Sequence, residues 1–244
     1  MEENKLTISI GHLYPKHLNL GGDIGNIITL KKRCQWRGID AQITEINIGE
    51  DIPECDFYYI GSGEYKQEEE VAAELYTKKN VLQKMRDKNS VFLGINGGFK
   101  LLGKYYQPLN NEHIKCADLL DIYTIAGKKR FTGNITSKTE LTTPNTLVGF
   151  ENHSDLTYIQ GETSALATTI IGKGNNGEDN KEGARFKNVF GTYILGPFLA
   201  KNSHFADYLI ELALEKRYGK KITLQELNDK IEVETHLSLI NKNY

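Results

Sequence analysis

Cysteine is scarce in this sequence and forms no recognisable pattern. Cys34, Cys55 and Cys116 are the three cysteines among 244 residues, and no two of them have the CxxC spacing of a metal or redox motif. Disulfide frameworks need paired cysteines and an oxidising compartment, so we interpret all three as reduced thiols of a cytoplasmic protein. We expect neither a metal centre nor a bound cofactor.

Long apolar runs and an excess of charge are also absent. No stretch approaches the roughly 18 consecutive apolar residues that read as a membrane-spanning helix, so we expect no membrane span. The 30 Lys and Arg residues are balanced by 32 Asp and Glu, which leaves a formal net charge of -2 and excludes the basic footprint of a nucleic-acid-binding protein. The N-terminal residues are acidic and polar, unlike those of a secretory signal peptide.

The first part of the chain alternates between strand and helix patterns. Apolar or alternating segments at residues 6–10, 41–48, 56–60 and 91–95 predict strands, and the apolar periodicity of residues 27–37 and 66–87 predicts helices. Helical crossovers between successive strands are typical of parallel sheets. We therefore predict an α/β fold with a mostly parallel central sheet flanked by helices.

The pattern changes after Gly103. Residues 119–125, 130–137 and 146–150 predict short strands with glycine turns between them, an antiparallel excursion from the central sheet. Residues 172–183 are polar and glycine-rich but lack the spacing of a phosphate-binding loop, so we interpret them as an exposed turn. Residues 187–194 predict a last buried strand, and residues 203–218 predict a helix. We divide the chain into a domain of residues 1–220 and a C-terminal helical tail of residues 221–244, whose helical periodicity spans 223–240.

The segment 91–103 is the one around which the chain is organised. Its apolar strand leads into Asn96, Gly97 and Gly98, and a short amphipathic helix follows. A strand, a sharp turn and a helix form a nucleophile elbow, in which the tip residue has a strained backbone and stands at the end of the sheet. Asparagine tolerates positive φ, so Asn96 is compatible with this backbone. A carboxamide is not a nucleophile, so the elbow lacks the reactive atom.

Polar residues at other predicted strand ends are weaker candidates. Asp23 and Asn26 either cap a helix or help its N-terminus to hold an anion, and composition favours the cap. The Gly61-Ser62-Gly63 turn either offers backbone N–H groups to a ligand or only reverses the chain. His153 is an acid/base candidate by type, whereas a lone histidine among polar neighbours is more often a hydrogen-bonding loop residue. We interpret the basic run after Asn26 as a solvated helix face, formed by Lys31, Lys32, Arg33 and Arg37.

In combination, these motifs resemble the class I (triad-type) glutamine amidotransferases. Within that family the chain is similar to the cobyric-acid-synthase-like (CobB/CobQ-like) branch, and there to the GatD-like subunits that work with a Mur-ligase-like protein (MurT) to amidate lipid II. The resemblance covers roughly residues 6–215 and implies a flavodoxin-like fold. Besides the elbow it rests on segments 17–20, 22–28, 61–63, 130–135, 148–153, 174–176 and 191–197.

The resemblance also implies a chemistry for which this chain lacks the groups. In the family, a cysteine at the elbow attacks the side-chain amide of glutamine, forms a thioester and releases ammonia, and a histidine serves as the base. The cysteine position is Asn96 here, and the histidine position is Leu195, which cannot move a proton. Lys100 stands at a glutamine position, and Pro197 stands where many members have a glutamate. Losing members of such a catalytic unit typically costs on the order of 10⁴-fold or more in rate, so we predict a pseudo-glutaminase.

Several ligand-binding positions of the family persist. The Gly61-Ser62-Gly63 turn and the backbone N–H of Gly97 would still form the oxyanion hole. Arg130 stands at the substrate-contacting arginine and would hold a carboxylate; without the resemblance it reads as a surface residue of a hairpin. Lys100 brings a new positive charge that fills the ligand space, pairs with Glu64 or binds a different carboxylate. The predicted binding set, for L-glutamine or another small carboxylate, is Gly61, Gly63, Gly97, Lys100 and Arg130.

Three functions remain open on the sequence alone. The first is a non-catalytic amidotransferase-like subunit, the structural or regulatory half of a heterodimer with a Mur-ligase-like (MurT-like) partner in cell-wall precursor modification. The second is an amino-acid-sensing binding module that uses Arg130 and the glycine turns. The third is an active glutaminase or another hydrolase that recruits different residues, such as His153, His113 or Lys100.

Overall fold

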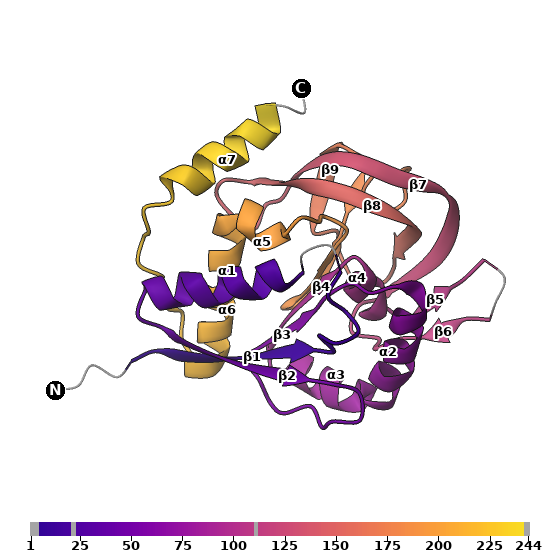
Figure 1. Ribbon diagram of the computed structural model, residues 1–244, viewed down its shortest axis with the longest axis horizontal. Helices are drawn as coiled ribbons and strands as arrows, with labels where there is room; N and C mark the ends of the chain where they lie inside the picture. The colour runs from indigo at the N-terminus through magenta and orange to yellow at the C-terminus, as the bar shows by residue number, and fades with distance from the viewer. Residues whose placement is uncertain (1–4, 21–22, 110–111, 242–244) are drawn as a thin grey trace.

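The central sheet of the molecule is almost entirely parallel. The computed structural model describes residues 5–20, 23–109 and 112–241 (Figure 1). The sheet has the strand order β11-β12-β4-β3-β1-β2, in which only the β11–β12 pair is antiparallel among the described strands. This confirms the predicted α/β class. The strands are β1 (Thr7–Leu13), β2 (Asp40–Ile46), β3 (Phe57–Ile60), β4 (Val91–Ile95), β11 (Ala184–Phe186) and β12 (Val189–Thr192).

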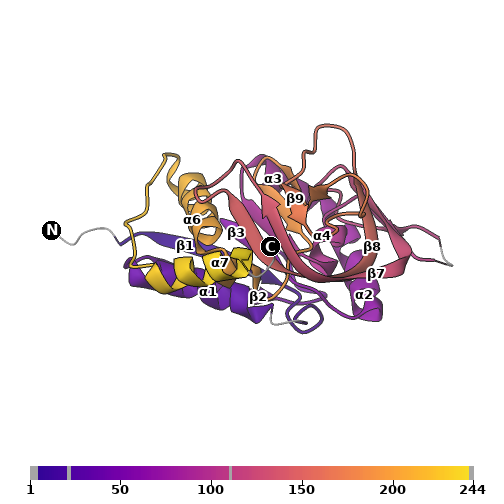
Figure 2. The ribbon, with the colours of Figure 1, turned by 90° about the horizontal axis from the view of Figure 1, so that it is seen from above.

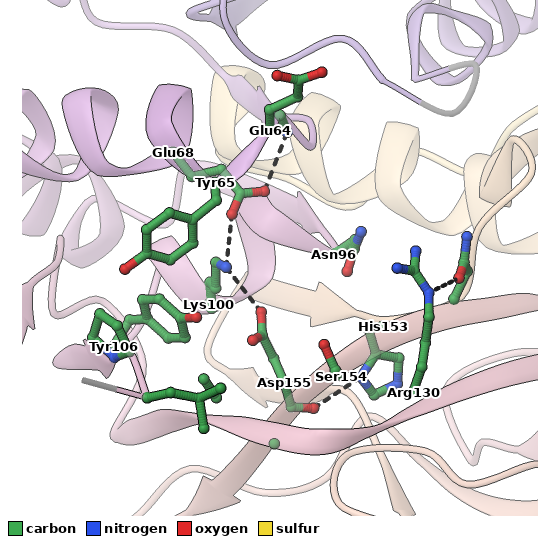
Figure 3. A pocket seen from close by; sticks show the side chains of 16 residues that line it. Glu64, Tyr65, Glu68, Asn96, Lys100, Tyr106, Arg130, His153, Ser154 and Asp155 are labelled. Atoms are coloured by element: carbon green, nitrogen blue, oxygen red, sulfur yellow. Dashed lines mark hydrogen bonds and ion pairs between the residues drawn. The ribbon is translucent and has the colours of Figure 1, made fainter. Parts of the chain in front are cut away.

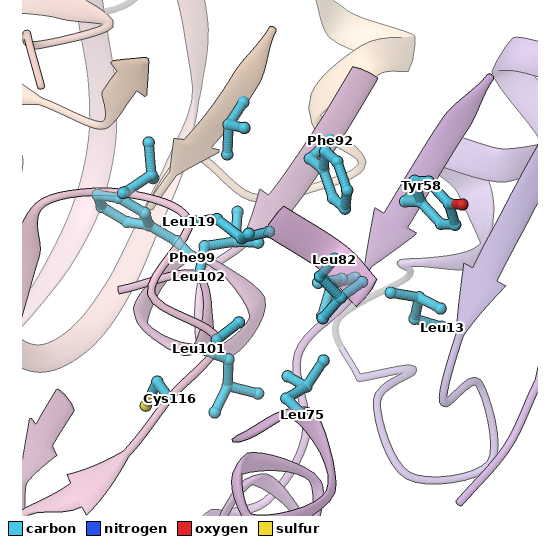
Figure 4. Close-up of a cluster of buried hydrophobic side chains, with 14 of the residues drawn as sticks. Leu13, Tyr58, Leu75, Leu82, Phe92, Phe99, Leu101, Leu102, Cys116 and Leu119 are labelled. Carbon is cyan, nitrogen blue, oxygen red and sulfur yellow. The ribbon is translucent and has the colours of Figure 1, made fainter. Parts of the chain in front are cut away.

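Helices cover both faces of this sheet, because its central strands are buried on both sides. In β3, Phe57 and Tyr59 join the core shared with α1 (Ile24–Trp36) and α6 (Ser203–Tyr218). Tyr58 and Ile60 face the opposite core. That core is shown in Figure 4 and is covered by α2 (Tyr65–Thr77), α3 (Lys79–Asp87) and α4 (Gly97–Leu101). A strand buried on both faces reads as a continuous apolar run, as β4 does.

The helix predicted at residues 66–87 is two helices. The chain leaves helical geometry at Lys78, where φ is -93° and ψ is 2°. At this point the hydroxyl of Thr77 donates a hydrogen bond to the carbonyl of Glu74 at 2.7 Å. Such back-bonding by threonine bends or ends helices, and the apolar spacing alone does not report it.

The antiparallel excursion is a second sheet built around two long strands. β7 (Ile122–Lys138) has 17 residues and β8 (Thr146–Ile159) has 14, so the prediction of several short strands was wrong. Their pairing is irregular only between Ala126 and Phe131, where four residues of β7 lie opposite Ser154. The glycines that suggested turns are accommodated inside the long strands. The remaining strands of this sheet are β5 (Tyr105–Gln107), β6 (Ile114–Lys115), β9 (Ala167–Ile171) and β10 (Lys181–Glu182).

The glycine-rich segment 172–183 is partly buried, which corrects its interpretation as an exposed turn. The backbone N–H groups of Lys173 and Gly174 donate to the carboxylate of Glu151 on β8 at 2.8–3.0 Å. Asn175 is fully buried and its amide donates to the carbonyl of Gly183. Polar groups of this segment therefore form hydrogen bonds within the protein. Amino-acid composition alone does not distinguish such buried polar groups from polar groups exposed to solvent.

The C-terminal part confirms the predicted last strand, β12, and the helix α6, whose bounds are those expected. α5 (Phe198–Lys201) lies between them, and the tail contains α7 (Lys230–Asn241), shorter than the periodic segment suggested. Figures 1 and 2 place α1, α5 and α7 on one side of the molecule and α2 on the other. The division of the chain at residue 220 stays a prediction.

Two arginines hold the tail on the domain. Arg33 of α1 is only 1% exposed and forms ion pairs with Asp207 and with Asp229 of the tail at 2.5 and 2.6 Å. Arg37 donates to the carbonyl of Gln225. The solvated-face interpretation is therefore wrong for Arg33 and for Arg37, whose side chain is 4% exposed and pairs with Asp207, although Lys31 and Lys32 are exposed. Burial of Arg33 follows from carboxylates contributed by distant segments, which the local sequence does not reveal.

Two general predictions can be compared with the described part of the chain. Within it, no helix is both long and apolar enough to cross a bilayer. Across the same residues, no three His, Cys, Asp or Glu side chains are grouped as metal ligands would be.

Candidate functional site

The elbow has the strained backbone that the sequence predicted. Asn96, between β4 and α4, has φ 49° and ψ -103°. The two glycines after it permit close packing: a Cβ on Gly98 would lie 2.2 Å from the carbonyl oxygen of Ile60, and one on Gly97 would lie 1.8 Å from Oε1 of Glu68. Gly98 is required by sterics because the backbone of Ile60 cannot give way, whereas a side chain at Gly97 would have to displace the end of Glu68. The turn therefore presents the side chain of Asn96 at the end of the central sheet.

The carboxamide of Asn96 is held by the neighbouring strand end. Its Nδ2 donates to Oγ of Ser62 at 3.0 Å, and the backbone N–H of Gly97 donates to the same oxygen at 3.4 Å. The backbone N–H of Ser62 in turn donates to the carboxylate of Asp23. Burial raises the pKa of Asp23 to about 7, although the hydrogen bonds from Ser62 and Tyr59 work against the rise.

Asp23 and Asn26 therefore serve neither as helix cap nor as anion site. The carboxylate of Asp23 accepts from Ser62 and Tyr59, rather than from the first turn of α1. Asn26 donates to the hydroxyl of Tyr59 and accepts from the backbone N–H of Leu199. The Gly21-Gly22 part of the preceding loop lies outside the described residues. These contacts make the junction a support for the Gly61-Ser62-Gly63 turn.

The turn directs its last backbone N–H toward an acidic side chain of α2. The N–H of Gly63 donates to Oε1 of Glu68 at 3.2 Å, and this carboxylate packs against Gly97. Glu68 forms an ion pair with Lys100 at 2.6 Å, and Lys100 forms a second one with Asp155 of β8 at 2.8 Å. Figure 3 shows the ammonium of Lys100 between the two carboxylates. We call these three residues the acid–lysine–acid triad.

The triad shows that the predicted pairing of Lys100 with Glu64 is wrong. It pairs with Glu68 and Asp155 of the protein itself, rather than with Glu64, which caps α2. Its side chain is 5% exposed, and its ammonium lies 4.1 Å from the ring centre of Tyr106. Burial on its own lowers the pKa of Lys100, but the charges of Asp155 and Glu68 outweigh it and raise that pKa above its ordinary value. Lys100 is therefore a permanent cation and not a nucleophilic amine.

His153 is part of a buried strand and not of a loop, contrary to the simpler prediction. It lies in β8, its ring stacks on that of Tyr193 with 3.8 Å between centroids, and its Nδ1 lies 2.8 Å from the carbonyl oxygen of Asp155. Burial lowers its pKa to about 4, only partly offset by the contact with Asp155. His153 is therefore neutral near pH 7. His113, the other histidine considered, stacks on Tyr105 at 4.3 Å beside β6.

Leu195 and Arg130 are both held by contacts with β8. The backbone N–H of Leu195 donates to the carbonyl of Phe150 on β8 at 2.8 Å, which fixes an apolar side chain at the family's base position. Arg130 is exposed in the irregular part of β7, and its Nε donates to Oδ1 of Asn152 at 2.6 Å. Its two remaining guanidinium nitrogens lie toward the open part of the cavity (Figure 3).

These elements enclose one cavity of about 670 Å³. Its wall brings together Gly63, Lys100 and Arg130 of the predicted binding set, together with Asn96 and His153, whereas Gly61 and Gly97 of that set are not among its lining residues. Sequence reasoning missed two charged wall residues, Glu68 and Asp155. Glu68 follows the glycine turn by one helical turn and Asp155 follows His153 by two strand positions. These spacings indicate a site only when it is already known that helix α2 and strand β8 meet at the elbow.

A mostly parallel α/β sheet with a strained elbow, together with a mostly antiparallel second sheet, defines a class I glutamine amidotransferase-like domain. A solved structure described as a glutamine amidotransferase has this fold, with a TM-score of 0.58 at 18% identity over 84% of this chain and 98% of its own. Residues 9–203 match the CobB/CobQ-like glutamine amidotransferase domain family, and the chain belongs to that family.

Two curated relatives match nearly the whole chain. The subunit GatD of lipid II isoglutaminyl synthase (glutamine-hydrolyzing) from Staphylococcus aureus (strain N315) is 37% identical over 237 residues, which are 96% of each chain. The subunit of the same name from Streptococcus pneumoniae (strain ATCC BAA-255 / R6) is 34% identical over 225 residues, 91% of this chain and 86% of its own.

Proposed function

We propose that this protein is a non-catalytic, GatD-like subunit that supports a Mur-ligase-like partner in the modification of cell-wall precursors. The observation that carries the proposal is the elbow itself, where a carboxamide, Asn96, occupies the strained nucleophile position. The family's base position holds Leu195, which has no ionisable group. The relatives named GatD, matched across almost the full chain, support the cell-wall role.

The candidates for substitute catalytic groups do not favour an active hydrolase. Lys100 is held as a cation by two carboxylates, and His113 is stacked on Tyr105. Neutral His153 lies in the cavity wall, but the elbow offers it no hydroxyl or thiol at the tip to activate. A general base without a positioned nucleophile supplies little rate enhancement.

A second function, amino-acid binding without turnover, is favoured by one observation. The free guanidinium nitrogens of Arg130 face the cavity of about 670 Å³, where a carboxylate would form charge-assisted hydrogen bonds. In this case the subunit would report the level of a small carboxylate to its partner. Neither function requires the pocket to hydrolyse glutamine.

The nitrogen source of the partner's reaction tests the proposal. The chain is co-expressed with a Mur-ligase-like protein from the same genome, and amidation of lipid II is measured with either L-glutamine or ammonium as nitrogen donor. We expect a co-purifying complex that uses ammonium and does not use glutamine. Amidation from glutamine, or ammonia release from glutamine by the purified chain, would overturn the proposal.

A further inference from the structure

The carboxylate of Glu68 lies against the backbone of the elbow, at the end of the cavity nearest to Asn96. The backbone N–H of Gly63 donates to its Oε1 at 3.2 Å. The same oxygen is only 1.8 Å from the position of a Cβ on Gly97, so the carboxylate packs directly on the residue that follows the elbow tip. The N–H of Gly97 is directed to Ser62. Side chains of the protein itself therefore accept the hydrogen bonds of both backbone N–H groups at this end of the pocket.

Two further residues keep Glu68 in this place. Lys100 lies 2.6 Å from its carboxylate and 2.8 Å from that of Asp155, and the ring of Tyr106 covers the ammonium. The side chains of Glu68 and Lys100 are 8% and 5% exposed. Moving Glu68 would leave a buried ammonium with one partner and strip a buried carboxylate of its counter-charge, and both changes are costly in a low-dielectric site.

The other end of the cavity, at Arg130, is positively charged and still has unused hydrogen-bond donors. Arg130 is exposed and uses one of its nitrogens on Asn152, which leaves the others directed into open space. A carboxylate there gains an ion pair. A carboxamide at the elbow end would instead compete with the carboxylate of Glu68 for the same space and for the N–H of Gly63, because the nearest backbone donors are already used.

We propose that Glu68, fixed by Lys100 and Asp155, is a built-in occupant of the elbow end, which restricts the pocket to small carboxylates that bind at Arg130 and end short of the elbow. An amino acid with a long amide side chain, such as glutamine, is excluded. The inference rests on the proposed non-catalytic function, because it gives the elbow a structural occupant in place of a substrate.

Calorimetric titration with two amino acids tests this inference. L-Glutamine has the excluded amide, whereas L-alanine has the same carboxylate end and a side chain too short to reach the elbow. For the variant Glu68→Ala/Lys100→Gln we expect glutamine to bind at least about tenfold tighter than to the wild type. We expect the affinity for L-alanine to change by less than about twofold, and Arg130→Ala to lose it. The matched control, Glu54→Ala/Lys88→Gln, removes an exposed ion pair of the same residue types at 2.6 Å and should behave as the wild type.

Equal glutamine affinity of the wild type and the folded Glu68→Ala/Lys100→Gln variant would overturn the inference, as would an absence of L-alanine binding to both. The variant's fold is checked by its circular dichroism spectrum. If it does not fold, Glu68→Ala/Lys100→Met, which places an apolar side chain on Tyr106, takes its place. The two hypotheses fail by different results. Ammonia release from glutamine by the wild type would contradict the proposed non-catalytic function. A wild type that releases no ammonia, with a variant that binds glutamine no better than the wild type does, would contradict only the inference about Glu68.

Discussion

Replacing Lys100 with methionine should destabilise the protein far more than losing an ordinary surface lysine. The substitution keeps the length and the packing against Tyr106, but it leaves the carboxylates of Glu68 and Asp155 without their shared cation. Breaking a buried ion pair by removing one partner costs about 3–5 kcal/mol. For a chain of this size each kcal/mol lowers the melting temperature by roughly 2–4 °C, so a fall of about 6–20 °C is expected.

The measurement is urea unfolding followed by circular dichroism at pH 7, with Lys88→Met as the matched control. Lys88 pairs with Glu54 at 2.6 Å, but both side chains are nearly half exposed, so its loss should cost about 0–1 kcal/mol. The variant Glu68→Gln/Lys100→Met removes one of the stranded charges and should recover part of the lost stability. A cost for Lys100→Met no larger than that of the control would refute the argument that the triad is a tightly held, buried unit.

Three further predictions concern the elbow, the cavity wall and the tail. Asn96→Val should be less stable than Asn96→Gly by about 1–3 kcal/mol in urea unfolding, because φ is 49° there and a β-branched residue resists that backbone; equal stabilities would contradict the strain. Burial lowers the pKa of His153 to about 4, so the unfolded chain binds its proton first and stability falls as the pH drops from about 6.5 toward 4. His153→Asn should remove on the order of 2 kcal/mol of the loss between pH 7 and 5, and an unchanged loss would count against it. Asp229→Asn, which weakens the ion pair with Arg33, should speed proteolytic cleavage at residues 219–230 with little change in global unfolding, whereas an unchanged digestion pattern would show that this pair does not hold the tail.

The elements of the central sheet were predictable because their signals are local. Runs such as β4 and helices such as α6 are determined by which residues are apolar and how they are spaced. The long strands β7 and β8 were underestimated; in β7, Gly127 suggested a turn that pairing with a partner strand overrides. The break at Lys78 coincides with one side-chain hydrogen bond, between Thr77 and Glu74, and the spacing of apolar residues does not reveal that bond.

The site was predictable in its backbone but not in its charges. Asn-Gly-Gly after a buried strand fixed the elbow, since few residues other than asparagine and glycine adopt its φ. The partners of Lys100 come from α2 and β8, 32 residues before it and 55 after it, so no local pattern connects them. The same holds for Arg33, whose counter-charges lie near the other end of the chain. Contacts between distant segments decide which charged residues are buried.

The position of the tail has a mechanical consequence for the cavity. Asp229 fastens the tail to α1 on the central sheet, while His236 of α7 lies 2.8 Å from Oγ1 of Thr146, where β8 of the second sheet begins. The cavity has one wall from each sheet, the elbow from the first and His153 to Asp155 of β8 from the second. The tail therefore links α1, which covers the first sheet, to the end of β8 remote from the cavity, so the two sheets that wall the cavity are also joined at a place away from it.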